Sequence, residues 1–191
     1  QSLTNSFMGL FAEADNQMKA YNQAITVIGI VAFVAAALLS LSARWWYPLS
    51  VPGATAATKL AGQPLAVILA WLIFVLALAE TLRAIYYRSG RLVVPTAGRI
   101  VGTGATIAIT LLAGAQQDLR LVAWGLLGGA IVETLVGFVG LAWVPDFRLR
   151  PSWPERVVLT NMVRSVGMPL TGQGVRVLGS IGERAMASLL G

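Results

Sequence analysis

The sequence contains no cysteine and no histidine among its 191 residues. Within these residues, disulfides, thiol nucleophiles, Cys/His metal sites and histidine-based catalytic triads are therefore excluded. Any chemistry would have to use carboxylates, hydroxyls, arginines and backbone groups. We expect a protein that is not an enzyme and that carries no metal and no cofactor.

Charge is also scarce, because only 12% of the residues are charged while 57% are hydrophobic and the mean hydropathy is +0.74. These values lie outside the usual range of soluble globular domains and predict a protein of the lipid bilayer. The net charge of +6 would suggest nucleic acid in a soluble protein. Here the arginines flank apolar runs, which favours anionic lipid headgroups as partners and argues against nucleic acid.

Nucleotide-binding motifs are missing from the chain. The stretch GQGVRVLG places Gly172, Gly174 and Gly179 at a spacing that is not G-x-G-x-x-G, and no G-x-x-x-x-G-K-[ST] occurs. An ATP-driven pump therefore has no support in this sequence.

Long apolar runs dominate what is present, and about twenty apolar residues cross a hydrocarbon core of ~30 Å. They predict an all-α, polytopic transmembrane bundle of about five spans. Four spans form one bundle over residues 25–144, and a fifth, more polar helix begins a further unit at 157–191. Residues 1–24 have helical amphipathic spacing, typical of an interfacial helix or of the end of a preceding span. The predicted spans are 25–43, 65–82, 97–115, 121–144 and 157–190.

Two pairs of glycines have the small-xxx-small spacing that lets helices approach closely. Gly98 and Gly102 lie in the third predicted span, and Gly125 and Gly129 lie in the fourth. The spacing predicts a tightly packed bundle, with dimerisation through these faces as the alternative.

Orientation follows from the distribution of Lys and Arg. One set of segments carries eight basic residues: the N-terminal segment, the predicted loop 83–99 and the proline-rich linker 145–156. The other side carries three, which are Arg44, Lys59 and Arg120. The positive-inside rule therefore predicts that both connections, 83–99 and 145–156, are cytoplasmic.

Charged residues inside the apolar runs need a reason, because each costs about 2.5 to 3.5 kcal/mol on insertion scales. Glu80 lies three residues before Arg83, on the same helical face, so we expect a structural ion pair near the end of the second span. Glu133 lies near the middle of the fourth span and has no partner nearby in sequence. A buried contact and a proton or cation relay are both open for it.

The last predicted helix carries the strongest candidates for binding an anionic substrate. The planar guanidinium of arginine suits phosphate oxygens, and a pyrophosphate inside a membrane needs its charge compensated. The alternative is that these residues neutralise one another in a helix contact. They are Arg164, Arg176, Glu183 and Arg184.

Several stretches follow one another along the chain: GLFAEADNQMKAYNQA, WYPLSVPG, ETLRAIYYRSGRLVVPTAGRIVG, VAWGLLGGAIVETLVGFVGL, PDFRLRPSW, GMPLTGQG and ERAMASLLG. In order, spacing and topology they resemble the third to seventh transmembrane helices of the MurJ (MviN) lipid II flippases. That family belongs to the multidrug, oligosaccharidyl-lipid and polysaccharide exporter superfamily. We therefore expect a piece of a longer chain.

The resemblance implies a two-lobe bundle of about fourteen helices in a bacterial cytoplasmic membrane, with alternating access driven by an ion gradient or membrane potential. The implied substrate is an undecaprenyl-pyrophosphate-linked peptidoglycan precursor. Relative to the family, the last-helix arginines are additional charges, and Glu183 stands where Asp is frequent. The alternatives are a non-transporting membrane subunit that packs in a larger complex, and an exporter of another polyprenyl-linked saccharide.

Overall fold

The computed structural model of the protein describes residues 17–51, 53–116, 119–144, 148–150 and 152–153. Over these residues the chain is all-α, without a strand, and four of its helices are long and apolar enough to cross a membrane. The predicted all-α, membrane-spanning fold is thereby confirmed. The elements are α2 (Gln17–Ser50), α3 (Ala56–Arg88), α4 (Val93–Gln116), α5 (Leu119–Gly140) and the short 3-10 helix η1 (Leu141–Trp143).

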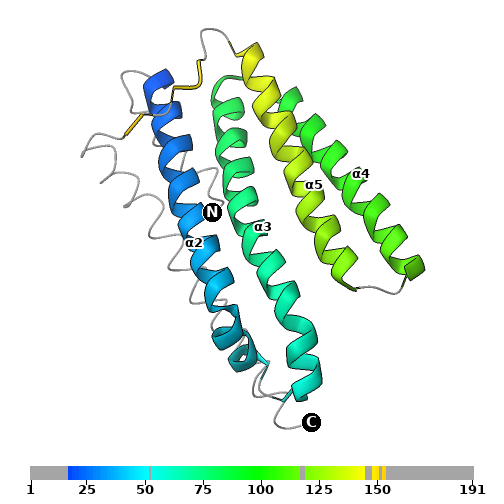
Figure 1. The fold of residues 1–191 in the computed structure, drawn as a ribbon. Helices are drawn as coiled ribbons and strands as arrows, with labels where there is room; N and C mark the ends of the chain where they lie inside the picture. The colour runs from blue at the N-terminus through cyan, green and yellow to red at the C-terminus, as the bar shows by residue number, and fades with distance from the viewer. Residues whose placement is uncertain (1–16, 52, 117–118, 145–147, 151, 154–191) are drawn as a thin grey trace.

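The four long helices lie side by side, in an order that differs from their order in the chain (Figure 1). α2 packs against α3, α3 against α5, and α5 against α4, whereas α3 and α4 have few contacts with each other. Successive helices run in opposite directions, so α3 and α5 are parallel. The start of α2, the α3–α4 turn and the end of α5 therefore share one end of the bundle, which we call the basic end.

Helices α2, α3 and α4 are longer than the predicted spans, whereas α5 begins two residues earlier than predicted and ends at Gly140, with η1 continuing the predicted span. α2 continues through Pro48 to Ser50, although the sequence predicted a turn from Pro48 onward. α3 begins at Ala56 and contains Pro64, although the sequence predicted a start after that proline. A proline in a helix interior removes one hydrogen bond, and packing of the neighbouring turns compensates for this loss. Residues 17–24 are the first turns of α2, continuous with the span that follows.

The connection between α3 and α4 is much shorter than the predicted loop 83–99, which was wrong in its extent. α3 continues to Arg88 and α4 begins at Val93. The turn is tight because Gly90 has a positive φ of 71° and the amide of Arg91 donates to the carbonyl of Tyr86 at 2.9 Å. This is the arrangement in which glycine ends a helix with a left-handed residue. Pro95 lies in the first turn of α4, where amides need no helical acceptor.

The predicted glycine faces pack on each other between α4 and α5. A Cβ on Gly102 would lie 2.6 Å from the carbonyl oxygen of Gly129, and one on Gly129 would lie 1.9 Å from Oγ1 of Thr106. Thr106 Oγ1 lies 3.3 Å from the carbonyl oxygen of Gly125, which it can reach as a donor across the interface. The close approach is thus made within one chain.

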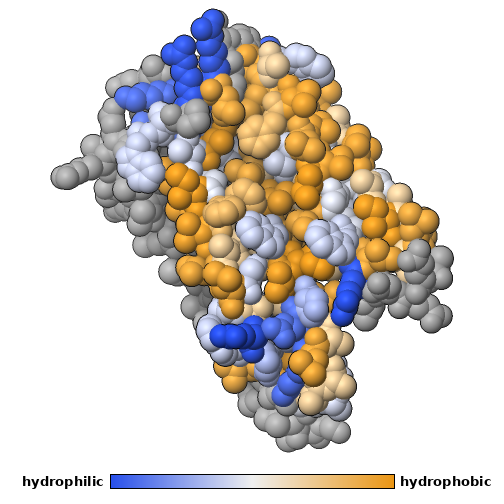
Figure 2. Space-filling view, viewed as in Figure 1, coloured by the Kyte–Doolittle hydropathy of each residue, from blue (hydrophilic) through white to orange (hydrophobic). Residues whose placement is uncertain are grey.

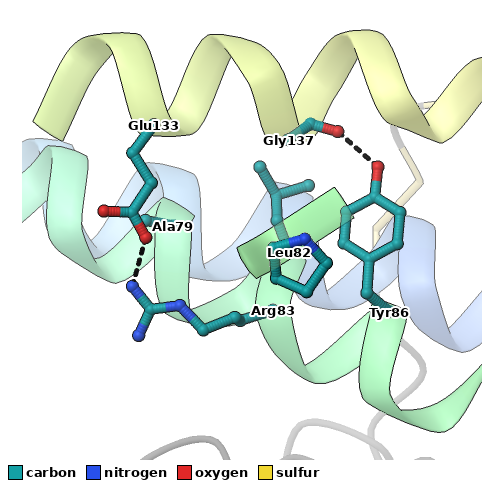
Figure 3. A pocket seen from close by; sticks show the side chains of 7 residues that line it. Ala79, Leu82, Arg83, Tyr86, Glu133 and Gly137 are labelled. Carbon is teal, nitrogen blue, oxygen red and sulfur yellow. Dashed lines mark hydrogen bonds and ion pairs between the residues drawn. The ribbon is translucent and has the colours of Figure 1, made fainter. Parts of the chain in front are cut away.

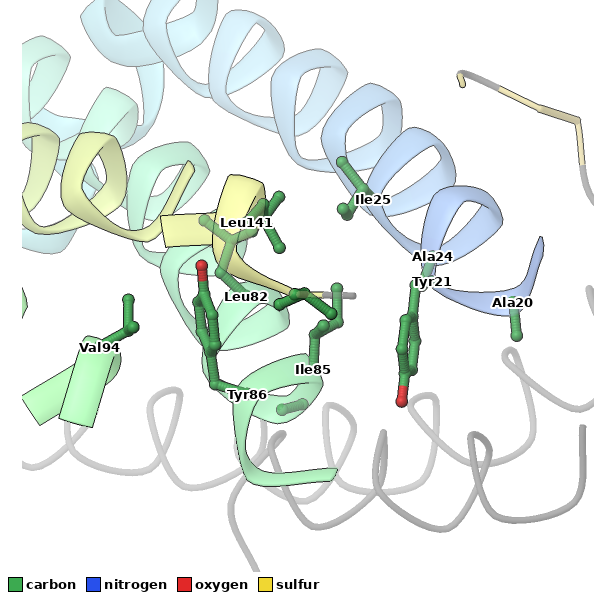
Figure 4. Packing of buried hydrophobic residues seen from close by; sticks show 11 residues of the cluster. Ala20, Tyr21, Ala24, Ile25, Leu82, Ile85, Tyr86, Val94 and Leu141 are labelled. Atoms are coloured by element: carbon green, nitrogen blue, oxygen red, sulfur yellow. The ribbon is translucent and has the colours of Figure 1, made fainter. Parts of the chain in front are cut away.

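Buried side chains gather mainly at the basic end, between α2, α3 and the end of α5 (Figure 4). Tyr21, Leu82, Ile85 and Tyr86 are almost completely buried there. In contrast, large apolar residues are exposed along the helices, and the face in Figure 2 is apolar between two ends where hydrophilic residues gather. This surface pattern is the one expected for helices in contact with lipid.

Candidate functional site

Arg83 is the centre of a cluster of three charged side chains between the described helices. Its Nη1 donates to Glu80 on the same helix, and its Nη2 donates to Glu133 on α5. Glu80 and Arg83 are three residues apart and therefore lie on one face of α3, as the sequence predicted. The contact with Glu133, fifty residues further along the chain, was not visible in the sequence.

The cluster is shielded by the close packing of three helices. The side chains of Arg83 and Glu133 are only 15% and 16% exposed. A Cβ on Gly102 of α4 would lie 3.0 Å from Cβ of Glu133, so the glycine face leaves room for this glutamate beside α4. At about 1.5 Å per residue, Glu133 lies about 15 Å from the end of its span at Trp143. The glutamate is therefore deep in the bundle and depends on Arg83 for charge compensation.

A small cavity adjoins the cluster between α3, α5 and the start of α4 (Figure 3). The space that the centre of a water molecule can reach is about 10 Å³. That is about the room one water needs, and far too little for a sugar or a pyrophosphate. Nε of Arg83 is buried and has no partner among the described residues. The cavity is lined by Ala79, Leu82, Arg83, Tyr86, Pro95, Glu133 and Gly137.

Two neutral contacts join α3 and α5 on either side of the charged cluster. The hydroxyl of Tyr86 donates to the carbonyl oxygen of Gly137, and that of Thr134 lies 3.3 Å from the carbonyl oxygen of Val75. Gly137 also lacks the space for a side chain, since a Cβ there would lie 2.9 Å from Cδ1 of Leu82. The site is an ion pair that connects two parallel helices. Among these residues no group is placed for covalent catalysis.

The residues predicted to bind substrate, namely Arg164, Arg176, Glu183 and Arg184, lie outside the described residues, as does the predicted fifth span. The structure instead reveals a polar group that the sequence analysis did not single out. Asn22 and Gln23 are buried at the start of α2 and bond to the backbone after α5. The available signal was a pair of side-chain amides on the apolar side of a helix that enters the membrane.

Comparison with known proteins gives one family. The family model described as lipid II flippase MurJ matches residues 1–191, which is the whole chain. Neither the curated proteins nor the solved structures contain a match. The family match agrees with the four apolar helices and with the resemblance noted in the sequence. This chain is therefore an integral membrane protein that belongs to the lipid II flippase MurJ family.

Proposed function

We propose that the chain takes part in moving a lipid-linked peptidoglycan precursor, lipid II, across the bacterial cytoplasmic membrane. The movement is by alternating access and makes or breaks no covalent bond. The observation that carries this proposal is the family match over residues 1–191. Its partners are then membrane lipids and an undecaprenyl-pyrophosphate-linked substrate.

The four described helices act as one supporting unit in this proposal. Arg83 joins α3 to α5 through Glu133, and the glycine faces join α5 to α4. Of the two readings of Glu133, the geometry supports a buried contact, because its carboxylate is engaged by the Arg83 guanidinium. The cavity beside it is too small for the substrate, so the headgroup binds elsewhere.

The charges of the last predicted helix are our candidates for contacting the pyrophosphate. Arginine forms paired hydrogen bonds with phosphate oxygens, and these residues would be costly in lipid without such a role. They are Arg164, Arg176, Glu183 and Arg184.

The proposal for the last helix is tested by replacing Arg176 and Arg184 with Ala in the full-length protein and measuring lipid II translocation in cells. We expect at least a tenfold loss of translocation at unchanged expression. The pair Arg88→Ala and Arg91→Ala, at the α3–α4 turn, is a matched control for loss of two positive charges. Translocation at the parent rate in the Arg176 and Arg184 variant would exclude the substrate role.

The proposed orientation places the basic end of the bundle in the cytoplasm. Lys19 and Arg88 are exposed at this end, as are Arg148 and Arg150 beyond α5. Arg44, Lys59 and Arg120 lie toward the opposite end. An excess of basic residues is characteristic of cytoplasmic connections, which supports this orientation.

The alternative of a non-transporting subunit depended on free glycine faces that would bind another protein. Gly102 and Gly129 pack against each other within the chain. We therefore favour the transporter.

A further inference from the structure

A short segment without regular secondary structure after α5, residues 148–150 and 152–153, lies against the first turns of α2. We call it the docked segment. Asn22 donates from Nδ2 to the carbonyl oxygen of Arg148 at 3.0 Å and accepts at Oδ1 from the amide of Arg150 at 2.9 Å. A single side chain thus pairs with a carbonyl and an amide two residues apart, as a neighbouring parallel strand would.

Two more contacts extend this attachment along α2. Gln23 donates from Nε2 to the carbonyl oxygen of Trp153 at 3.3 Å, and the amide of Ser152 donates to Oγ1 of Thr26 at 3.4 Å. All four contacts use the main chain of the docked segment. They hold defined backbone positions of the segment rather than its side chains.

The amide side chains of α2 that make these contacts are buried, whereas the large apolar side chains of the docked segment are exposed. Asn22 and Gln23 are 7% and 2% exposed, whereas Leu149 and Trp153 of the docked segment are 53% and 71% exposed. The large apolar side chains of the segment therefore contribute little to the attachment. Each hydrogen bond contributes about 0.5–1.5 kcal/mol net, because water replaces it when it opens. An attachment of this kind is reversible, unlike one built on a packed apolar core.

We propose that Asn22, Gln23 and Thr26 form a latch that holds the docked segment on α2 in this conformation and releases it in another conformation during transport. The transport part of this inference rests on the proposed function. The latch holds the last described residues of the chain, 148–150 and 152–153, against the start of α2. A small change in a few hydrogen bonds is thereby coupled to a rigid-body change between parts of the transporter.

The attachment itself is tested by thiol labelling, which does not require transport activity. Oγ of Ser152 is buried, so in a background free of other cysteines a Ser152→Cys thiol reacts slowly with a maleimide in membranes. Adding Asn22→Leu removes two of the four contacts and is expected to accelerate labelling at least fivefold. Ser42→Ala is the control, because its hydroxyl bonds only within α2. Equal labelling rates with and without Asn22→Leu would overturn the latch.

Release during transport is tested by closing the latch covalently. Thr26→Cys and Ser152→Cys place two thiols at neighbouring residues, because the backbone amide of Ser152 donates to Oγ1 of Thr26 at 3.4 Å. We expect oxidation to reduce lipid II translocation at least tenfold and a reductant to restore it, with both single-cysteine variants unaffected by oxidation. Full translocation by a completely cross-linked protein would contradict the release step. Failure of the cysteine-free parent to translocate would instead count against the proposed function, and the labelling comparison would still decide the attachment.

Discussion

Arg83 forms the charged contact between α3 and α5. It contacts carboxylates on both helices, and it is shielded from the surroundings together with Glu133. Removing one member of such a pair is costly, because the remaining charge stays in an apolar interior. Replacing both Arg83 and Glu133 removes that cost at the contact between α3 and α5, while Glu80, which is 28% exposed, still loses its contact with Arg83.

We therefore expect Arg83→Leu to lower the free energy of unfolding by roughly 3 kcal/mol and Glu133→Leu by a similar amount. The double variant should lose less than the sum, with a coupling energy of roughly 1–3 kcal/mol. Denaturant unfolding of the purified protein in one detergent measures all four forms. Strictly additive losses would show that the contact between Arg83 and Glu133 contributes no stability.

At the scale of whole elements, the contact between α4 and α5 depends on glycines, whose lack of a side chain lets the two backbones approach closely. Gly102 and Gly129 face each other's carbonyl oxygens, and a Cβ on either would lie within 2.6 Å of one. Backbone atoms cannot move aside as the end of a flexible side chain can. The helices would have to separate, and Glu133 would lose the packing that α4 provides.

We expect Gly102→Ala or Gly129→Ala to lower the free energy of unfolding by roughly 1–3 kcal/mol through overpacking. Gly104→Ala is the matched control on α4, because a Cβ there would meet no atom of another helix within 4 Å. This control should be neutral or more stable by up to about 1 kcal/mol, since alanine favours the helix. The same unfolding measurement separates the three variants, and equal effects at all three positions would contradict the close approach.

The sequence predicted the helices better than it predicted their contacts. An apolar run indicates where a helix crosses lipid, but it does not indicate how far the helix continues into the interface, so the ends at Ser50 and Ala56 were missed. The pair of Glu80 and Arg83 is local and could be recognised from a three-residue spacing. The partner of Glu133 could not, because it depends on which helices become neighbours.

At the scale of the whole molecule, the alternating direction of the helices brings the basic segments to one end (Figure 1). If that end is cytoplasmic, Leu92→Cys in the α3–α4 turn will react with an impermeant thiol reagent only after the membrane is opened. Ala57→Cys, exposed at the start of α3, will react in spheroplasts without permeabilisation. The reverse pattern would invert the proposed orientation.

The proposed movement of lipid II by the full-length protein is tested by measuring lipid II translocation in cells depleted of their own flippase. We expect expression of the protein to restore lipid II on the outer face, where an enzyme added outside the cells can cleave it. Lipid II that stays on the inner face, despite normal expression and membrane insertion, would show that the protein does not move lipid II.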